Sequence, residues 1–352
     1  MENIFDVLIV CALREEYDAL VAVTDGIHRA WIENKVDGWL TSTSVFNCSE
    51  GVLSIQATWL GDIGREQALA TAGQLISLRP SRSSAMCGIC AGDPSKTSLG
   101  DVIFASSIWS YDAGKIVVIN GESYFAAESH HYKPKPKLMQ RYRAFKIDCS
   151  PWQSLRPKLT LEQQEAWYIR AKLASILEAE AFEENCPDWS LYVYNRLLKR
   201  GWITENGDLT DVGDKKALQL NVQYRNNPLP TKDFKVHVGA IATGAAVVED
   251  DGIFTRLYNT VRGVRGIDME SSAIAALGAV TDKPVFIVKG ISDYGDQFKD
   301  DRYREFAARS SAEALVKFLR YYPELFRNGN ARRRNSGRSK LIQEIESKYV
   351  RD

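Results

Sequence analysis

The stretch at residues 266–296 constrains the fold and function of this chain more than any other part of the sequence. Within it, residues 283–290 (KPVFIVKG) form a continuous apolar run that a proline and a glycine delimit. Such a run predicts a strand buried on both faces of a parallel sheet. Asp293 follows directly, and in open α/β sheets ligands bind beyond the carboxyl ends of the strands. We therefore expect the Asp293 carboxylate to face a ligand.

A second carboxylate, Glu270, precedes a run of small apolar residues at 273–280, which predicts a closely packed helix. Glu270 falls at or near the first turn, where free N–H groups and the positive end of the helix dipole favour an anion. A Glu at a helix start can also be a simple cap, and an Asp after a strand can simply close a turn. The two acids together predict a binding site.

These two motifs, Met269-Glu270 and Ser292-Asp293, resemble signatures of the nucleoside phosphorylase and methylthioadenosine/S-adenosylhomocysteine nucleosidase superfamily. The resemblance covers roughly residues 1–130 and 236–322. It implies an α/β fold with a central mixed, mostly parallel sheet flanked by helices. The sequence KGISDYGD followed by KDDRYREFAA is similar in particular to the purine nucleosidase domains of fungal immune receptors and bacterial antiphage effectors. Some of those domains hydrolyse purine nucleotides such as ATP.

The amino-terminal segment is informative about the reaction. A buried strand is expected at residues 5–12 (FDVLIVCA), and it ends in Leu13-Arg14-Glu15-Glu16. The nucleosidase branch has an Ala-Met-Glu-Glu-Glu turn here, so the resemblance places Glu16 at the acid that activates water. Phosphorylases instead have a Gly-Asp-Pro type loop with an Arg that holds phosphate. The resemblance therefore favours hydrolysis.

The resemblance also implies roles for other residues. Lys289 matches an Arg that helps orient the water, and Cys90 replaces a Ser in a Gly-Ser-Ala-Gly-Gly motif. The loop at 243–248 is similar to one that stacks on the purine, although Val247 stands where an aromatic residue is expected. The expected substrate-binding residues are Glu270, Met269, Cys90, Ala91, Gly92, Val247, Val248, Ser292, Lys289, Leu13 and Arg14.

The resemblance implies a mechanism with three acids. Asp293 would hold or donate a proton at the purine N7, which requires a raised pKa. Glu270 would bind the ribose hydroxyls and stabilise the developing oxocarbenium charge. Glu16 would take a proton from water on the opposite face, as in inverting glycoside hydrolysis. Asp293 and Glu16 are the expected catalytic residues, and no metal and no cofactor is expected.

The family pattern is interrupted, which predicts four segments. A nucleosidase core at 1–130 and 236–322 would carry an insertion at 131–235, and a basic tail would follow at 323–352. A long helix is expected at 161–184 and a second at 189–200, followed by a hairpin turn at Asn206-Gly207 and a further helix. This order resembles a winged helix. We expect a lid, a dimer element or a sensor rather than a DNA-binding module.

The composition limits the classes of binding partner and the cellular compartment that we expect for this chain. The 45 basic and 45 acidic residues cancel, so no global field favours nucleic acid or membranes. The six cysteines are scattered, and Cys87 and Cys90 form a CxxC without a second pair, so we expect reduced thiols and no zinc. Neither a signal peptide nor an apolar run of about 20 residues is evident. These features predict a cytoplasmic protein.

The expected partners are a purine nucleoside or nucleotide, a second copy of the chain in a homodimer or higher oligomer, and a protein that binds the insertion or the tail. Three alternatives remain open. A phosphorylase would release ribose 1-phosphate, whereas a non-catalytic sensor would bind without turnover. A winged-helix regulator would bind duplex DNA with a steep salt dependence.

Overall fold

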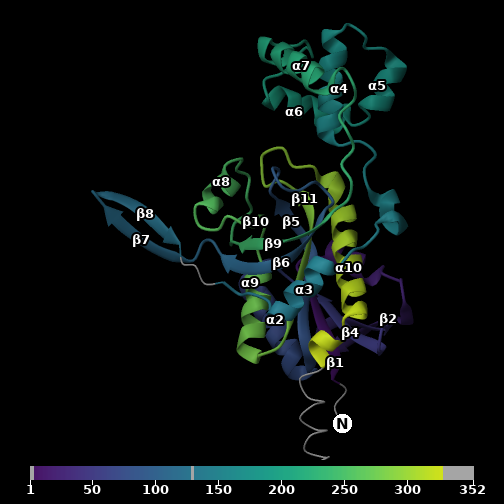
Figure 1. The fold of residues 1–352 in the computed structure, drawn as a ribbon, viewed down its shortest axis with the longest axis vertical. Coiled ribbons are helices and arrows are strands. Elements are labelled where there is room, and N and C mark those ends of the chain that lie inside the picture. Colours follow the sequence, from purple (N-terminus) through teal and green to yellow (C-terminus); the bar gives the residue numbers. More distant parts are fainter. Residues whose placement is uncertain (1–3, 128–130, 328–352) are drawn as a thin grey trace, which may run out of the picture. The chain divides into compact units, whose positions relative to one another are not determined.

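The computed structural model of the chain describes residues 4–127 and 131–327 (Figure 1). The basic tail expected beyond residue 327, with its short helix at 341–349, lies outside the described residues. Contacts divide the chain into two compact units. The first comprises the residues up to Gln153 and from Phe234 onward, and the second is Ser154–Asp233.

Within the described residues, the first unit is built on a nine-stranded mixed sheet with the order β10-β9-β6-β11-β5-β1-β4-β3-β2. Its strands are β1 (Phe5–Cys11), β2 (Ile27–Val36), β3 (Trp39–Cys48), β4 (Gly51–Trp59), β5 (Ser81–Gly92), β6 (Val102–Ser110), β9 (Val236–Thr243), β10 (Val264–Asp268) and β11 (Val285–Asp293). β10 also pairs with β5, so β5, β11, β6, β9 and β10 close into a ring. The predicted class, a mixed sheet flanked by helices, is confirmed.

Helices cover both sides of the sheet (Figure 1). The helices α1 (Arg14–Val21), α3 (Pro136–Ala144) and α10 (Arg304–Tyr321) share one apolar core with β1, β5, β6 and β11. On the other side, α2 (Arg65–Leu78) packs on α9 (Ser271–Thr281), which contacts β5, β6 and β11. A short α8 (Ile253–Tyr258) lies against β10, and η1 (Ser150–Leu155) and η3 (Asp301–Tyr303) are 3₁₀ turns. None of the helices in the described residues combines the length and apolarity that a membrane span requires.

The strand β11 shows why the apolar run at 283–290 folds as it does. Its residues 286–292 are all buried, because β5 pairs with one edge, β6 with the other, and α10 covers a face. Gly290 is required for that packing: a Cβ at this position would stand 2.0 Å from the backbone oxygen of Ala307 in α10. The absence of a side chain there lets helix and strand approach closely.

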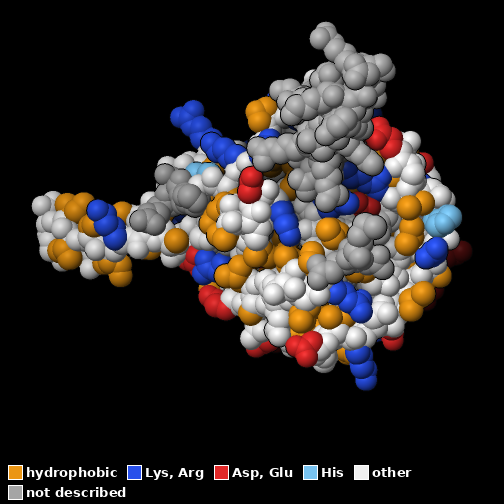
Figure 2. All heavy atoms as spheres, turned by 90° about the horizontal axis from the view of Figure 1, so that it is seen from below, with side chains coloured by type: hydrophobic (Ala, Val, Ile, Leu, Met, Phe, Trp, Pro, Cys, Tyr) orange, Lys and Arg blue, Asp and Glu red, His pale blue; other side chains and the backbone are white. Residues whose placement is uncertain are grey.

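A second sheet in the described residues is a hairpin of β7 (Gly114–Ile119) and β8 (Glu122–Ala127), which extends away from the larger sheet (Figure 1). Asn120 and Gly121 form its turn with positive φ values of 53° and 83°. Ile116, Val118 and Phe125 share one face and are 74%, 69% and 53% exposed. Figure 2 shows that apolar side chains gather along the projecting arm. This hairpin was not predicted from the sequence.

The second unit is mainly helical, with its own apolar core. Its helices are α4 (Leu161–Leu173), α5 (Ala179–Asn185), the π-helical turn η2 (Trp189–Val193), α6 (Tyr194–Lys199) and α7 (Asp211–Tyr224). Between α6 and α7 a bridge joins Ile203 to Leu209 around the expected Asn206-Gly207 turn, where Gly207 has φ 77°. The turn and the helices that flank it lie where they were predicted, but the first predicted helix is divided into α4 and α5. The winged-helix class itself stays a prediction.

Two sequence-based boundaries differ from the structure. The single helix predicted at 161–184 is wrong: α4 ends at Leu173, Ser175 has a φ of 55°, and α5 begins at Ala179. The left-handed backbone at Ser175 interrupts the helix. The inserted unit begins at Ser154 rather than at residue 131, because Leu138, Tyr142 and Phe145 pack in the core of the first unit.

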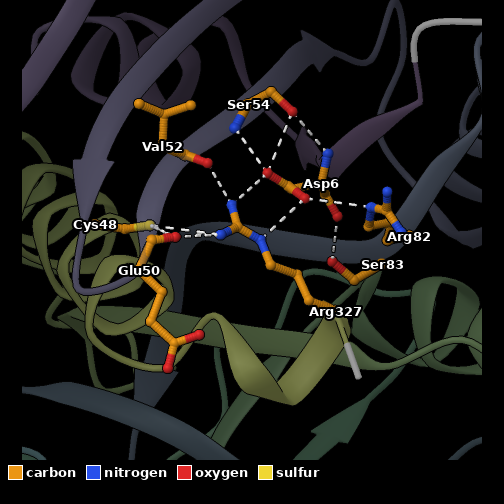
Figure 3. A network of polar contacts seen from close by, with 8 residues as sticks. All are labelled: Asp6, Cys48, Glu50, Val52, Ser54, Arg82, Ser83 and Arg327. Atoms are coloured by element: carbon orange, nitrogen blue, oxygen red, sulfur yellow. Dashed lines mark hydrogen bonds and ion pairs between the residues drawn. The ribbon is translucent and has the colours of Figure 1, made fainter. Parts of the chain in front are cut away.

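The amino end of β1 is held by the last described residue (Figure 3). The Arg327 guanidinium donates to Asp6 Oδ2 at 2.8 Å and to the Glu50 carbonyl at 2.7 Å, and it also bonds the Val52 carbonyl. Ser54 N–H donates to the same Asp6 oxygen at 3.1 Å. Arg327 therefore joins the end of α10 and its extension to β1 and β4, at the sheet edge opposite the ends of β1, β5 and β11 discussed next.

Candidate functional site

Three neighbouring parallel strands bring predicted site residues to one edge of the sheet. β11, β5 and β1 lie side by side in that order, and they end at Asp293, Gly92 and Cys11. Carboxyl ends of adjacent parallel strands meet at a common edge, where loops and helix starts can surround a ligand. The side chains that follow from these ends are therefore candidates for one site.

Backbone amides hold the Glu16 carboxylate. Its Oε2 accepts from the N–H groups of Ala12 at 2.7 Å and Leu13 at 3.0 Å, and its Oε1 accepts from Ile89 N–H at 2.8 Å. Glu16 is buried in the first turn of α1. The carboxylate lies over Gly88, where a Cβ would stand 2.2 Å from Oε1. The glycine in β5 is therefore needed for the carboxylate to reach Ile89.

Glu270 is the N-cap of α9 and is buried. Its Oε1 accepts from Gly64 N–H at 3.0 Å, and Gly64 has a φ of 119°, which favours glycine. Burial raises the pKa of Glu270 to about 7; Lys289 and the Gly64 N–H oppose that rise, whereas Asp268 and Glu16 add to it. Near neutral pH this carboxyl group is thus poised between its two protonation states.

Lys289 and Asp268 form an ion pair inside the protein. The distance from Lys289 Nζ to Asp268 Oδ2 is 3.1 Å, and the two side chains are 1% and 2% exposed. Burial lowers the pKa of Lys289, but the carboxylates of Asp268, Glu16 and Glu270 outweigh it and raise that pKa above its usual value. Sequence reasoning missed Asp268, although it ends β10 two residues before Glu270.

Asp293 lies at the end of β11 and is half-buried. Its Oδ2 accepts from the Ser292 hydroxyl at 2.8 Å, and its Oδ1 accepts from Gly295 N–H at 2.8 Å. Ser292 also donates to the backbone oxygen of Cys90 at 3.4 Å. These bonds orient the carboxyl group of Asp293 and link it to β5.

Cys90 marks the point where the predicted groups meet. Burial raises the pKa of its thiol; the charge of Lys289 lowers it, and those of Asp268, Asp293 and Glu16 raise it further. Contacts with consecutive residues of β5 place these groups near one another: Glu16 Oε1 accepts from Ile89 N–H, Ser292 donates to the Cys90 carbonyl, and Asp293 pairs with Ala91. Lys289 pairs with Gly88, the residue that the Glu16 carboxylate covers.

Of the remaining predicted residues, several lie close to the acids or to Gly295, and one is exposed to solvent. Ala91 and Val248 both lie beside Gly295, where a Cβ would be 3.3 Å from Ala91 Cβ and 3.5 Å from Val248 Cγ1. Gly92 is buried in β5, and Met269 and Leu13 are half-buried next to Glu270 and Glu16. By contrast, Val247 is 63% exposed and contributes no enclosed wall.

The Arg14 side chain is engaged away from the acids. It bonds Asp18 at 2.8 Å in the next turn of α1, and its guanidinium lies over the Trp59 ring, 4.6 Å from the centroid. Arg14 is exposed. The Glu16 carboxylate is thus bonded by the backbone N–H groups of Ala12, Leu13 and Ile89, and the Arg14 side chain bonds Asp18 instead.

Tyr111 is a further aromatic neighbour that sequence reasoning missed. A Cβ at Gly244 would stand 2.2 Å from the tyrosine ring, so the ring lies directly on the loop after β9. Tyr111 and Val248 both pack against the cluster around Trp109 and Phe254. Tyr111 directly follows β6, and no local sequence pattern connects it with the loop after β9.

Asp112 connects two loops of this region. Arg65 donates to its two carboxylate oxygens at 2.7 and 2.8 Å, and Ala245 N–H donates to Oδ2 at 2.8 Å. Arg65 follows Gly64, which bonds Glu270, and Ala245 lies in the loop expected at the purine. The carboxylate of Asp112 therefore fixes both loops relative to the root of the β7–β8 hairpin.

A separate hollow lies between α2 and α9. It is lined by Arg65, Glu66, Leu69, Ser110, Tyr132, Ser272, Ala273 and Ala276. None of these is a predicted site residue, although Arg65 follows Gly64, which bonds Glu270, and Ser272 lies two residues after Glu270. In the part of the chain that the structure describes, no group of three or more His, Cys, Asp or Glu side chains could hold a metal ion.

Comparison with known proteins agrees with this fold. Residues 190–321 match the family model of the phosphorylase superfamily. Futalosine hydrolase of Helicobacter pylori superposes with a TM-score of 0.54 at 13% identity, covering 90% of this chain and 97% of that one. The 5′-methylthioadenosine/S-adenosylhomocysteine nucleosidase of Neisseria meningitidis gives 0.51 at 13% identity, covering 90% and 98%. The fold is therefore that of nucleosidases, and the predicted resemblance to the phosphorylase superfamily is confirmed.

Two curated proteins are similar in sequence. The uncharacterized protein y4jS of Sinorhizobium fredii is 25% identical over 315 residues, covering 88% of this chain and 60% of that protein. The ATP nucleosidase Cap17 of Escherichia coli is 23% identical over 318 residues, covering 90% and 51%. The chain thus spans between half and three fifths of the length of these relatives.

Proposed function

We propose that this chain is a purine nucleosidase that hydrolyses the N-glycosidic bond of an adenine nucleoside or nucleotide and releases the free base. The observation that carries the proposal is geometric. Glu16 bonds Ile89 of β5, Asp293 pairs with Ala91 two residues further along β5, and Glu270 follows Asp268, which holds Lys289 on β11. Cleavage of this bond needs an acid for the leaving base, a base for water and a negative group for the sugar.

In this proposal Glu16 is the base that takes a proton from water. Three backbone N–H groups hold it, two on Oε2 and one on Oε1. Each carboxylate oxygen has two acceptor positions, so Oε1 keeps one for a water molecule. Donors that are fixed before the reaction avoid the cost of reorienting the carboxylate during it.

Glu270 would bind the ribose hydroxyls in its ionised form. Its Oε1 accepts one bond from Gly64 and can still accept from a hydroxyl. The negative charge would stabilise the oxocarbenium character of the sugar in the transition state. Since the pKa of Glu270 is raised to about 7, activity is expected to fall as the pH drops below neutrality.

Asp293 would hold or donate the proton at N7 of the leaving purine. Ser292 and Gly295 fix its two oxygens, and Ala91 and Val248 lie beside Gly295 as apolar neighbours for a purine ring. Tyr111, on the same loop cluster, offers the aromatic face that Val247 lacks. Proton transfer of this kind contributes on the order of 10²–10⁴-fold to a rate.

The pairing of basic side chains supports hydrolysis over phosphorolysis. A phosphorylase needs cations that are available to inorganic phosphate. Around the acids, Lys289 pairs with Asp268, Arg65 with Asp112, Arg14 with Asp18, and Arg304 with Glu15. Water requires no such cation, and the position of Glu16 suits its activation.

The proposed substrate class has a sequence argument of its own. The relative named ATP nucleosidase covers 90% of this chain, which supports an adenine nucleotide as substrate. The resemblance to antiphage effector domains adds the proposal that nucleotide depletion serves antiviral defence. Methylthioadenosine is the alternative substrate, because the solved structures of similar fold include nucleosidases of that compound.

The experiment is incubation of the purified chain with adenosine, methylthioadenosine, AMP and ATP, with and without phosphate, while free adenine is measured. We expect adenine to be released without phosphate and the rate to fall at least about 100-fold in Asp293→Asn. Adenine release that requires phosphate would identify a phosphorylase. Binding without turnover in the wild type would identify a sensor, and unchanged turnover in Asp293→Asn would contradict the role of that residue.

A further inference from the structure

Asp268, the buried partner of Lys289, has no role in the three-acid mechanism, yet it lies two residues before Glu270 and holds the lysine that neighbours Glu16 and Glu270. We infer that Asp268 is a positioning residue, which holds Lys289 as a fixed cation shared by Glu16 and Glu270. The inference rests on the proposed nucleosidase function and adds a residue to its machinery. It concerns the sugar and water side of the site rather than the purine side.

The geometry around Asp268 is that of a fully engaged carboxylate. Oδ1 accepts from the Thr243 hydroxyl at 2.9 Å, and Oδ2 accepts from Lys289 Nζ at 3.1 Å and from the Ser271 hydroxyl. The Ser271 N–H lies 3.2 Å from Oδ2 and 3.3 Å from Oδ1. These donors come from β9, β11 and the start of α9, so Asp268 joins the three elements beneath Glu270.

A lysine in this position needs such a partner. Removing an ammonium group from water costs several kcal/mol unless a counter-charge and hydrogen bonds compensate. Lys289 has only a 1% exposed side chain, and it lies on β11 between β5 and β6. Without Asp268 the ammonium would turn to the remaining carboxylates, Glu16 and Glu270, and would occupy acceptors that the reaction needs.

The pair also sets the charge that Glu270 experiences. The groups that act on Glu270 are Lys289 from β11, Asp268 from β10, Glu16 from α1 and the N–H of Gly64. Lys289 favours the ionised form of Glu270, whereas Asp268 and Glu16 disfavour it. The loss of Lys289 and the loss of Asp268 should therefore move the titration of Glu270 in opposite directions.

This opposition gives the test. We would measure kcat/KM of adenine release against pH in Asp268→Asn and Lys289→Met. Asp268→Asn should lower kcat at least about tenfold. It should also shift the acidic limb, the part of the pH profile where activity falls as the pH drops, to lower pH by on the order of one pH unit. Lys289→Met should shift this limb to higher pH by a similar amount. A purely structural role would lower activity without moving the limb. Shifts in the same direction, or none, would overturn the inference.

The matched control is Asp6→Asn. Asp6 is a buried aspartate that pairs with Arg327 at the far end of β1, so its loss removes a similar interaction remote from Glu270. It should lower stability and leave the limb in place. A limb that moves equally in Asp6→Asn would contradict the inference.

Two further measurements keep the test decisive. If a single variant does not fold, the double variant Asp268→Asn/Lys289→Met removes both charges together and should fold. Its acidic limb should lie close to that of the wild type, because the two opposite shifts cancel, and wild-type kcat in this variant would overturn the inference. If the wild type releases no adenine, the proposed function fails, and carboxyl titration of Glu270 by ¹³C NMR tests the opposite shifts independently.

Discussion

Glu270 carries a measurable consequence at the scale of a single residue. Its pKa is raised from 4.5 to about 7 in the folded chain, so between these values the folded state holds a proton that the unfolded state has lost. Stability from this group is therefore highest below about pH 4.5 and falls as the pH rises to about 7. At roughly 1.4 kcal/mol per pH unit, the decline is about 3 kcal/mol.

Glu270→Gln should abolish this decline. We expect the free energy of unfolding of the variant, relative to wild type, to rise by about 3 kcal/mol between pH 4.5 and 7.5. Urea unfolding at several pH values measures it. Glu33→Gln, at an exposed position on β2, should follow the wild type throughout. A Glu270→Gln curve parallel to wild type would show that the carboxyl group is not protonated at neutral pH.

The residue scale also shows what the sequence could predict of the site. Glu270 and Asp293 were predicted for the site because one begins a helix and the other follows a strand, and Glu16 was predicted from the family resemblance of the turn after the first strand. Asp268 was missed because its partners Lys289 and Thr243 are 21 and 25 residues away in the sequence. An ion pair between such distant residues is not indicated by any local sequence pattern. Tyr111 was missed for the same reason, since only folding brings it onto Gly244.

At the scale of elements, close packing of β11 against α10 depends on one glycine. Gly290→Ala would place a Cβ 2.0 Å from the Ala307 carbonyl oxygen, which is backbone and cannot rotate away. We expect a loss of about 1–3 kcal/mol in unfolding free energy, because helix and strand must separate. Thermal or urea unfolding measures the effect.

Gly73→Ala is the control. Gly73 lies within α2, where no atom comes within 4 Å of an added Cβ. Alanine is a better helix former than glycine, so this variant should be more stable by about 0.5–1 kcal/mol. Replacing glycine by alanine should thus lower the free energy of unfolding at position 290 and raise it at position 73. Destabilisation of equal size in both would mean that packing against α10 is not the cause.

Element prediction succeeded where patterns were strong and failed where contacts decide. The apolar runs of β1 and β11 were recognised because both faces are buried. The strand β2 was not predicted, since most of its residues face solvent and its polar sequence carries no alternation. The break at Ser175 was missed because its left-handed backbone is set by the fold and not by a glycine or proline.

At the scale of the whole chain, Arg327 connects the end of the first unit to its beginning. Arg327→Ala should lower the unfolding free energy by about 2 kcal/mol, because Asp6 and the carbonyls of Glu50 and Val52 lose their donor together. Arg82→Ala removes a partner of the same Asp6 at 3.4 Å that is more exposed, and should cost less than about 1 kcal/mol. Equal losses in urea unfolding would argue against the network in Figure 3.

The division into two units was only partly readable from the sequence. The interruption of the family pattern near residue 131 was visible, but α3 then returns Leu138 and Tyr142 to the first core. Such a return depends on which apolar surface is left uncovered by α1 and α10, and that is known only once the sheet is assembled. The end of the inserted unit, at Asp233, lies within a few residues of the predicted boundary.

The attachment of Asp112 gives the projecting hairpin a mechanical relation to the acids. Its carboxylate receives Arg65, whose neighbour Gly64 bonds Glu270, and it receives Ala245 from the loop after β9. A molecule that binds the tip of the β7–β8 hairpin and moves its base must therefore also move these two loops. By thermodynamic reciprocity, if binding at the arm changes the affinity for a nucleoside, the nucleoside changes the affinity at the arm by the same factor.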